Sequence, residues 1–147
     1  MSASGCHNAN IHRAKGIIES SYMEISKYQS NNEQDILSAI KKDPNWDIFT
    51  NENTIGVYKN ALNDSATYVC YHGTEFTGYV RAILDAGIAI YISELYVVPK
   101  WRNQKVGRSL LETVKAEFPK LTVYALSDED AYYERLDYKK VGSVFQL

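Results

Sequence analysis

Residues 102–108 have the types and the spacing that bind an anion. Arg102, Lys105 and Arg108 place three cationic side chains around one glycine, Gly107. From Val106 onward the apolar residues recur at helical spacing, which puts this cluster at the start of a helix. The first N–H groups of a helix have no internal partner, and together with the helix dipole they favour a phosphate. The pattern therefore indicates a phosphate site; the alternative is an ordinary strand-to-helix connection with a solvated basic face.

A buried strand and a helix must position this turn. Residues 88–98 form a long apolar, β-branched and aromatic run, interrupted only by Ser93 and Glu94. Such a run is typical of a strand that is covered on both faces. Pro99 cannot donate a hydrogen bond to a neighbouring strand, so the strand ends there. The helix then runs to residue 118, where Pro119 stops it.

Length and composition bound the class of protein. With 147 residues and 45% hydrophobic content, we expect one domain over residues 21–147 and a loose tail over residues 1–20. A net charge of −2 gives no basic surface for nucleic acid, and no apolar run reaches the ~18 residues of a membrane helix. Cys6 and Cys70 form neither a disulfide framework nor a metal site. We expect a cytoplasmic protein that binds no metal, nucleic acid or membrane.

The remaining sequence predicts a mixed sheet. Strands are expected at residues 22–28, 66–71, 76–84, 88–98, 121–126 and 139–146. Helices are expected from Asn31 or Asn32 to the Asp43-Pro44 pair, and over residues 52–62, 106–118 and 128–136. Residues 72–75 read as a hairpin turn. This order predicts an α/β (α+β) fold with a mixed, mostly antiparallel central sheet and helices on both faces.

Two segments resemble the signatures of one family. The pattern Val97-x-Pro99-x-x-Arg102-x-x-x-Val106-Gly107-x-x-Leu110-Leu111 is similar to the acetyl-coenzyme A signature of the GCN5-related N-acetyltransferases (GNAT). The segment Ala131-Tyr132-Tyr133-Glu134-Arg135-Leu136-Asp137-Tyr138 resembles the family's later Ala-x-x-Phe-Tyr-Glu-x-Leu-Gly-Phe helix. Both lie in the expected order, and the resemblance covers residues 66–147. It implies a GNAT-type sheet and acetyl-coenzyme A as the cosubstrate.

The turn departs from the family pattern, which is usually Arg-Gly-x-Gly-x-Gly or Ala. Asn103 and Lys105 occupy positions that are usually glycine. Asparagine tolerates the left-handed conformation, whereas Lys105 tolerates it less well and could offer its ammonium to a phosphate. A second register, Gln104-x-x-Gly107-x-Ser109, fits a loose form of the signature. We prefer the Arg102 register because it keeps the spacing to Pro99 and to the paired leucines.

The resemblance implies how coenzyme A is held. In the family, backbone groups of the strand bind the pantetheine arm, and a local bulge opens that strand away from its neighbour. Here those contacts fall on Leu95, Tyr96 and Val97, and an amide near Val97 would polarise the thioester carbonyl. After Arg102, the pyrophosphate would rest on the amides of Asn103, Gln104, Lys105, Val106, Gly107 and Arg108.

The resemblance also implies the catalytic groups. Tyr133 matches the family tyrosine that protonates the leaving thiolate, and a phenol with a pKa of about 10 suits that role. Its alternative is an aromatic core residue packed near Leu136. The glutamate that serves as base in several members would stand at Ser93, so it is absent. Glu94 is the candidate base or amine-binding group, because burial makes a carboxylate more basic; its alternative is an ion pair or hydrogen bond to a neighbouring element.

We conclude from the sequence that the protein is an acetyl-coenzyme A-dependent N-acetyltransferase. Transfer to a primary amine of a small molecule or peptide would be direct, in a ternary complex, because neither cysteine lies near the turn or the strand in sequence. The alternative is a GNAT-like module that senses or docks acyl-coenzyme A without turnover. A homodimer is left open.

Overall fold

The computed structural model describes residues 22–147, so the tail expected over residues 1–20 lies outside the described residues. Five strands form one sheet in the order β1-β2-β3-β4-β5 over the described chain. The first four strands are antiparallel, and β5 runs parallel to β4. The strands are β1 Met23–Lys27, β2 Ala66–His72, β3 Glu75–Asp85, β4 Ala89–Val97 and β5 Thr122–Ala125.

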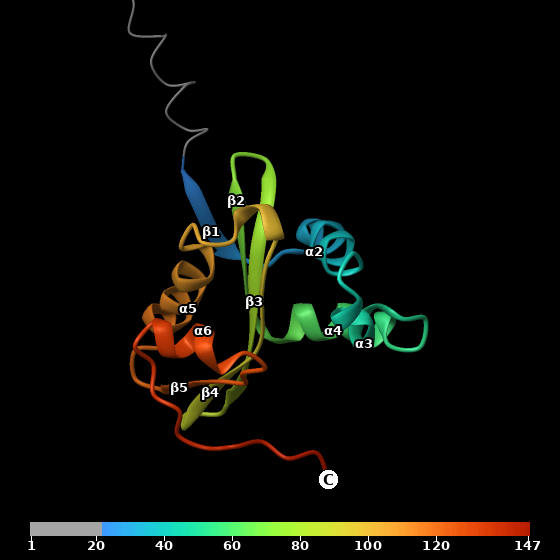
Figure 1. Ribbon diagram of the computed structural model, residues 1–147. Helices are drawn as coiled ribbons and strands as arrows, with labels where there is room; N and C mark the ends of the chain where they lie inside the picture. The colour runs from blue at the N-terminus through green and yellow to red at the C-terminus, as the bar shows by residue number, and fades with distance from the viewer. Residues whose placement is uncertain (1–21) are drawn as a thin grey trace, which may run out of the picture.

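Helices cover both faces of the sheet (Figure 1). One face carries α5 and α6, and the other carries α2, α3 and α4. The α-helices are α2 Glu33–Ile40, α3 Asp47–Thr50, α4 Ile55–Asp64, α5 Val106–Glu117 and α6 Asp130–Arg135. Short 3-10 turns precede α2, α3 and the basic turn, at Ser30–Asn32, Pro44–Trp46 and Pro99–Trp101. The predicted fold class, a mixed and mostly antiparallel sheet between helices, is confirmed.

Two hydrophobic cores lie on opposite sides of the sheet, and β4 contributes to both. Ile90 and Ile92 pack in the first core, under α5, while Tyr96 packs in the second, under α2 and α4. Successive side chains of a strand point to opposite faces, so both faces of β4 must be apolar. This explains why the sequence of β4 reads as an almost continuous apolar run.

The apolar stripe of α5 anchors the basic turn to the first core. Val106, Leu110, Leu111 and Val114 are all buried on the side that faces the sheet. Burial of such side chains contributes roughly 1.5–3 kcal/mol each, so the start of α5 is held firmly beside the end of β4.

The structure corrects two predictions about the elements. The strand predicted over residues 139–146 is wrong: residues 139–147 form neither helix nor strand, and Val141 and Phe145 are 69% and 81% exposed. Their valine and phenylalanine side chains supply strand propensity, but a strand also needs a paired neighbour. The second short helix begins at Ile55 rather than residue 52, because Asn51 accepts hydrogen bonds from the amides of Asn53 and Thr54 and holds a turn.

Candidate active site

The basic turn adopts a left-handed backbone at two positions. Asn103 has φ 62° and Lys105 has φ 65°, whereas Arg102 is extended with φ −68° and ψ 154°. These are the two positions where the resemblance expects glycine, the residue that adopts positive φ without a steric penalty. The turn therefore keeps a glycine-type backbone although it carries two larger side chains.

The first amides of α5 are free to bind a ligand. The first helical hydrogen bond runs from the Ser109 N–H to the Lys105 carbonyl at 2.9 Å. Among the described residues no group accepts a hydrogen bond from the amides of Val106, Gly107 or Arg108. The N–H groups of this twelve-residue helix and its dipole give this corner a positive potential.

Close packing surrounds Gly107. A Cβ atom at this position would collide with the hydroxyl of Tyr132 and would lie 3.6 Å from a methyl group of Val97. The end of β4, the start of α5 and α6 therefore meet at this glycine. The Tyr132 hydroxyl beside the turn was not predicted from the sequence, and no local signal marks it.

A β-bulge interrupts the pairing of β3 with β4. Arg81 pairs with Glu94, but the next residue of β3, Ala82, pairs with Ile92. Ser93 is therefore an extra residue in β4, which gives the strand a local bend. The bulge coincides with the end of the parallel ladder, because β5 pairs only with Ala89–Ile92 of β4.

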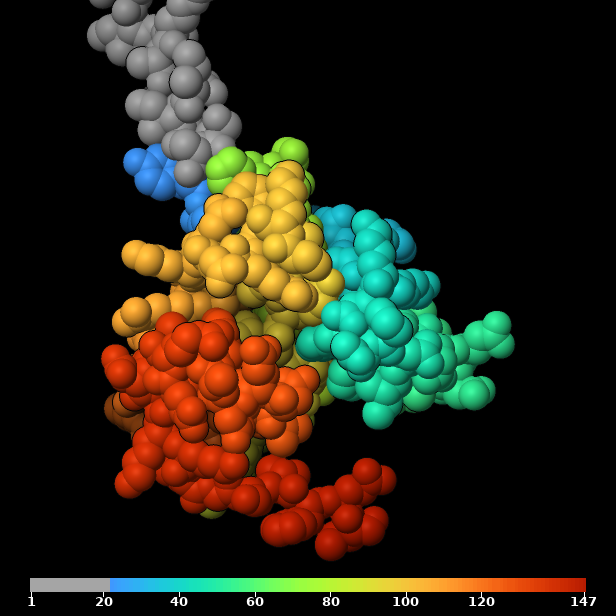
Figure 2. Space-filling model, viewed as in Figure 1, coloured from blue at the N-terminus to red at the C-terminus, as the bar shows by residue number. Residues whose placement is uncertain are grey.

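Beyond Ile92, β4 presents an open edge. The Val98 N–H donates to the Thr77 carbonyl of the β3 segment at 2.9 Å, whereas the Val97 carbonyl turns the other way and accepts from Arg102 Nε at 3.0 Å. Because main-chain directions alternate, Leu95 faces the same open side as Val97. Figure 2 shows β4 in a depression between the red α6 region and the cyan α3 region.

Of the three residues predicted to contact pantetheine, Leu95 and Val97 turn their main-chain groups to the open edge, whereas Tyr96 does not. The main chain of Tyr96 pairs with Tyr79 of β3. Its side chain is buried in the second core, and its hydroxyl donates to the Ala39 carbonyl at 3.4 Å. The main-chain groups of Tyr96 therefore point away from the open edge.

Glu94 forms the ion pair that the sequence analysis gave as its alternative. Its carboxylate accepts from Arg81 Nε and Nη2, both at 2.7 Å, and the two side chains are 4% and 9% exposed as residues. The linked hydroxyls of Tyr58 and Tyr79 lie in the same buried network. Burial, with the charge of Glu94, raises the pKa of both tyrosines. Both oxygens of Glu94 are thus engaged in structural contacts.

Tyr133 is a buried phenol on α6. Burial, and then the neighbouring Tyr132 phenol and the negative charge of Asp128, raises the pKa of Tyr133 to about 12. Its ring packs against the first core and meets the Tyr132 ring edge-on, with centroids 5.2 Å apart. Tyr133 is therefore protonated throughout the neutral range and can donate a proton.

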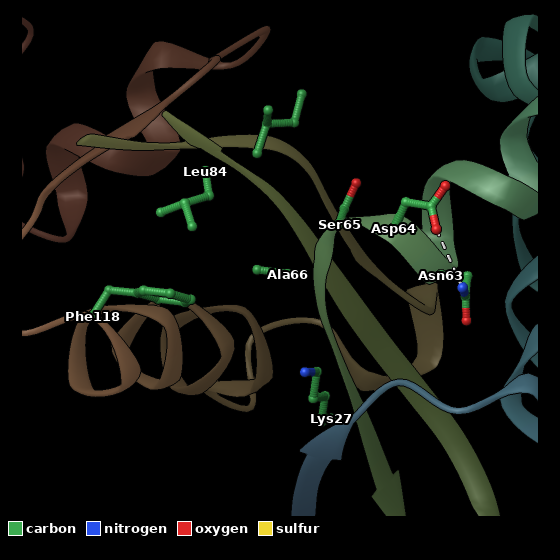
Figure 3. A pocket seen from close by; sticks show the side chains of 8 residues that line it. Lys27, Asn63, Asp64, Ser65, Ala66, Leu84 and Phe118 are labelled. Atoms are coloured by element: carbon green, nitrogen blue, oxygen red, sulfur yellow. Dashed lines mark hydrogen bonds between the residues drawn. The ribbon is translucent and has the colours of Figure 1, made fainter. Parts of the chain in front are cut away.

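Two surface pockets flank the sheet. A pocket of about 410 Å³ adjoins the basic turn through Arg102 and is lined on its other side by α2. A pocket of about 350 Å³ lies at the opposite end, where Ser65, Leu84 and Phe118 line it (Figure 3).

Over residues 22–147 no group of three or more His, Cys, Asp or Glu side chains is arranged to hold a metal ion. In the same residues no helix has the length and apolar character needed to cross a bilayer.

Fold and site together define a mixed α/β domain in which unpaired amides and basic side chains at a helix start lie beside an open strand edge. A family model described as the acetyltransferase (GNAT) domain matches residues 45–146, well over half of the chain. The chain therefore belongs to the GNAT acetyltransferase family, and it is an N-acetyltransferase by that membership. No curated protein is similar enough in sequence to be matched.

Solved structures share the fold at low sequence identity. A GNAT-family acetyltransferase from Streptococcus pneumoniae TIGR4 aligns with TM-score 0.67 and 20% identity, over 86% of this chain and 98% of that one. The aminoglycoside acetyltransferase AAC(6')-Iy, in complex with a coenzyme A bisubstrate analogue, aligns with TM-score 0.68 and 14% identity, over 86% and 97%. An aminoglycoside acetyltransferase from an uncultured soil metagenomic sample, in complex with sisomicin, aligns with TM-score 0.60 and 16% identity, over 85% and 96%.

Proposed function

We propose that this enzyme transfers an acetyl group from acetyl-coenzyme A to a primary amine of a small molecule or peptide. The observation that carries the proposal is that unpaired amides at the start of α5 lie next to the open edge of β4. One binds a diphosphate, and the other binds the amide-containing arm that joins this diphosphate to the thioester.

Each part of the cosubstrate has a complementary surface. The pyrophosphate rests on the amides from Asn103 to Arg108, with the side chains of Lys105 and Arg108 adding positive charge. The pantetheine arm pairs with Leu95 and Val97 as an added strand would. The Val97 carbonyl already accepts from Arg102, so its N–H is the group that polarises the thioester carbonyl.

Tyr133 is the proposed general acid. Its pKa of about 12 keeps the hydroxyl protonated at neutral pH, so a proton is present for the departing thiolate of coenzyme A, although the same shift makes the phenol a weaker acid. The neutral amine attacks the carbonyl carbon, the carbon–sulfur bond breaks and the thiolate takes this proton; the tyrosinate then recovers a proton from the acetylated nitrogen, directly or through water. The proposal is direct transfer: Cys70, the cysteine within the described residues, is buried in the first core, and burial raises its pKa.

The acceptor amine must lose a proton without a free carboxylate base. Glu94 is engaged by Arg81 through both oxygens, so we propose that the amine arrives neutral or that water accepts its proton. The rate should then rise with pH until the acceptor amine itself is deprotonated. A rate that instead levels off at the same pH for amines of different pKa would show a protein base.

Thiol release in the presence of an amine panel tests the proposal. The panel should include aminoglycosides, because two of the similar solved structures are aminoglycoside acetyltransferases, together with polyamines, amino acids and peptides. Calorimetry with acetyl-coenzyme A is run in parallel. Binding with thiol release supports the enzyme, and an absence of binding refutes the site.

The second candidate function is an acyl-coenzyme A-binding module without turnover. It is favoured by the engagement of Glu94 with Arg81, which leaves the bulge without a free carboxylate. Binding of acetyl-coenzyme A with no thiol release across the whole panel would support this candidate over the enzyme.

A further inference from the structure

We propose that Arg81 is a positioning residue for acetyl transfer, because it holds both residues of the β4 bulge. We call Arg81, Ser93 and Glu94 the bulge clamp. The inference rests on the proposed function, since it concerns the strand edge that would hold the thioester.

The guanidinium of Arg81 contacts each residue of the bulge. Nε and Nη2 donate to the two carboxylate oxygens of Glu94 at 2.7 Å, and Nη2 also donates to Ser93 Oγ at 3.1 Å. The remaining nitrogen, Nη1, donates to Ser65 Oγ at 3.0 Å, where α4 ends. One planar, buried side chain thus ties the extra residue and its neighbour to β3 and to the adjoining helix end.

The bulge determines which amides of β4 face the open edge. The Ile92 carbonyl accepts from Leu126 N–H at 2.9 Å, so Ile92 faces β5. Leu95 faces the same side although it lies three residues later, which a regular strand does not allow. If Ser93 were paired regularly with β3, the main-chain groups of Tyr96 would face the open edge. The amides of Leu95 and Val97 would then point toward β3.

The bulge clamp is better suited to fixing the positions of residues than to stabilising the fold. A buried ion pair contributes little net stability compared with apolar side chains of similar volume, because both charges must be desolvated. A forked guanidinium, in contrast, fixes the relative positions of the three residues that accept its hydrogen bonds: Ser93 and Glu94 of β4, and Ser65 at the end of α4. Displacing reacting groups by about 1 Å can cost about 10²-fold in rate, so the bulge is a sensitive point of control.

The double variant Arg81→Met with Glu94→Leu removes the clamp without leaving a buried unpaired charge. We expect thermal stability close to wild type and an acetyl-coenzyme A Kd within about threefold, because the pyrophosphate amides of α5 are untouched. We expect kcat to fall about 10- to 100-fold. The pH–rate profile should keep its shape at a lower plateau, since a positioning residue does not titrate in the reaction.

Three results would overturn the inference. Wild-type kcat in the double variant would make the clamp purely structural. A changed pH–rate profile would identify Glu94 as the base. Failure of the wild-type protein to bind acetyl-coenzyme A or to release thiol would instead refute the proposed function, before any variant is compared.

Ser93 supplies a matched pair in case the double variant loses stability. Ser93→Ala removes only the hydroxyl contact with Arg81, and Ser93→Thr restores a hydroxyl at the same position. We expect a several-fold lower kcat in Ser93→Ala with unchanged thermal stability, and recovery in Ser93→Thr. Equal kcat in both variants and in wild type would overturn the inference.

Discussion

Replacement of Lys105 by glycine should stabilise the protein and lower its affinity for acetyl-coenzyme A. Lys105 stands at φ 65° immediately before α5, and its side chain makes no hydrogen bond or ion pair with the described residues. The structure therefore separates two contributions of one residue: the strain of its backbone, and the charge it offers to a phosphate.

The two contributions have opposite signs. A non-glycine residue in the left-handed region lowers the free energy of unfolding by about 1–2 kcal/mol. Glycine avoids this strain, but its greater freedom in the unfolded chain offsets about 0.5–1 kcal/mol of the gain. Lys105→Gly should therefore gain about 0.5–1 kcal/mol, or roughly 1–3 °C in Tm for a domain of this size. Loss of an exposed charge beside a phosphate should cost up to about 1 kcal/mol, a roughly fivefold higher Kd for acetyl-coenzyme A.

Two matched variants separate strain from charge. Lys105→Ala loses the charge but keeps a Cβ at positive φ, so its Kd should match Lys105→Gly while its Tm does not rise. Asn103→Gly removes a residue that tolerates φ 62° well, so its gain should be only a few tenths of a kcal/mol. Differential scanning calorimetry and titration calorimetry at two salt concentrations give both quantities. An equal Tm for the glycine and alanine variants would refute the reasoning about backbone strain.

Three further changes to the chain test the site and the fold. Tyr133→Phe should lower kcat about 10²-fold or more with little change in acetyl-coenzyme A affinity, and an unchanged rate would remove Tyr133 from catalysis. Because its folded pKa is about 12 against about 10 when unfolded, the stability contributed by protonated Tyr133 should be lost as pH rises through 10–12, and fluorescence-monitored unfolding of Tyr133→Phe should show a smaller alkaline loss than wild type. Gly107→Asp should weaken acetyl-coenzyme A binding at least tenfold in calorimetry, because its side chain meets Tyr132 and brings a negative charge to the phosphate corner, whereas Gly142→Asp, which has open space around it, should bind as wild type does; equal affinities would show that the phosphate site is misplaced. Truncation after Tyr138 should change Tm by less than about 3 °C, since residues 139–147 are all exposed and their ion pairing to the described chain is the surface pair between Lys140 and Asp130; a larger loss would indicate that this segment packs in solution.

The parts of the fold that the sequence could predict are those with long local patterns. The apolar run of β4, the stop at Pro99 and the stripe of α5 each span many residues, and each predicts its element alone. The spacing of the turn also assigned Asn103 and Lys105 to glycine positions, and the structure shows both at positive φ. A motif can therefore predict a backbone conformation even where the usual residue type is missing.

The parts that could not be predicted depend on register between distant segments. Glu94 pairs with Arg81 because β3 and β4 pair with one extra residue at Ser93. The family resemblance implies a bulge in this strand, but nothing in the local sequence marks Ser93 as the extra residue. The Tyr132 hydroxyl reaches Gly107 only through the packing of α6 on α5. The strand predicted near the C-terminus was wrong for the converse reason: the β propensity of its valine and phenylalanine residues is local, whereas a strand requires a paired partner.

Ser93 shows how small a change can open a sheet. Deleting it would leave Ile92 on the α5 side and Glu94 on the α4 side, as they are now, so both cores would keep their present occupants. The strand would simply lie straight and could continue along β5 past Ile92. A single inserted residue is thus enough to end the pairing of β4 with β5, while the side chains on both faces of the sheet stay in their cores.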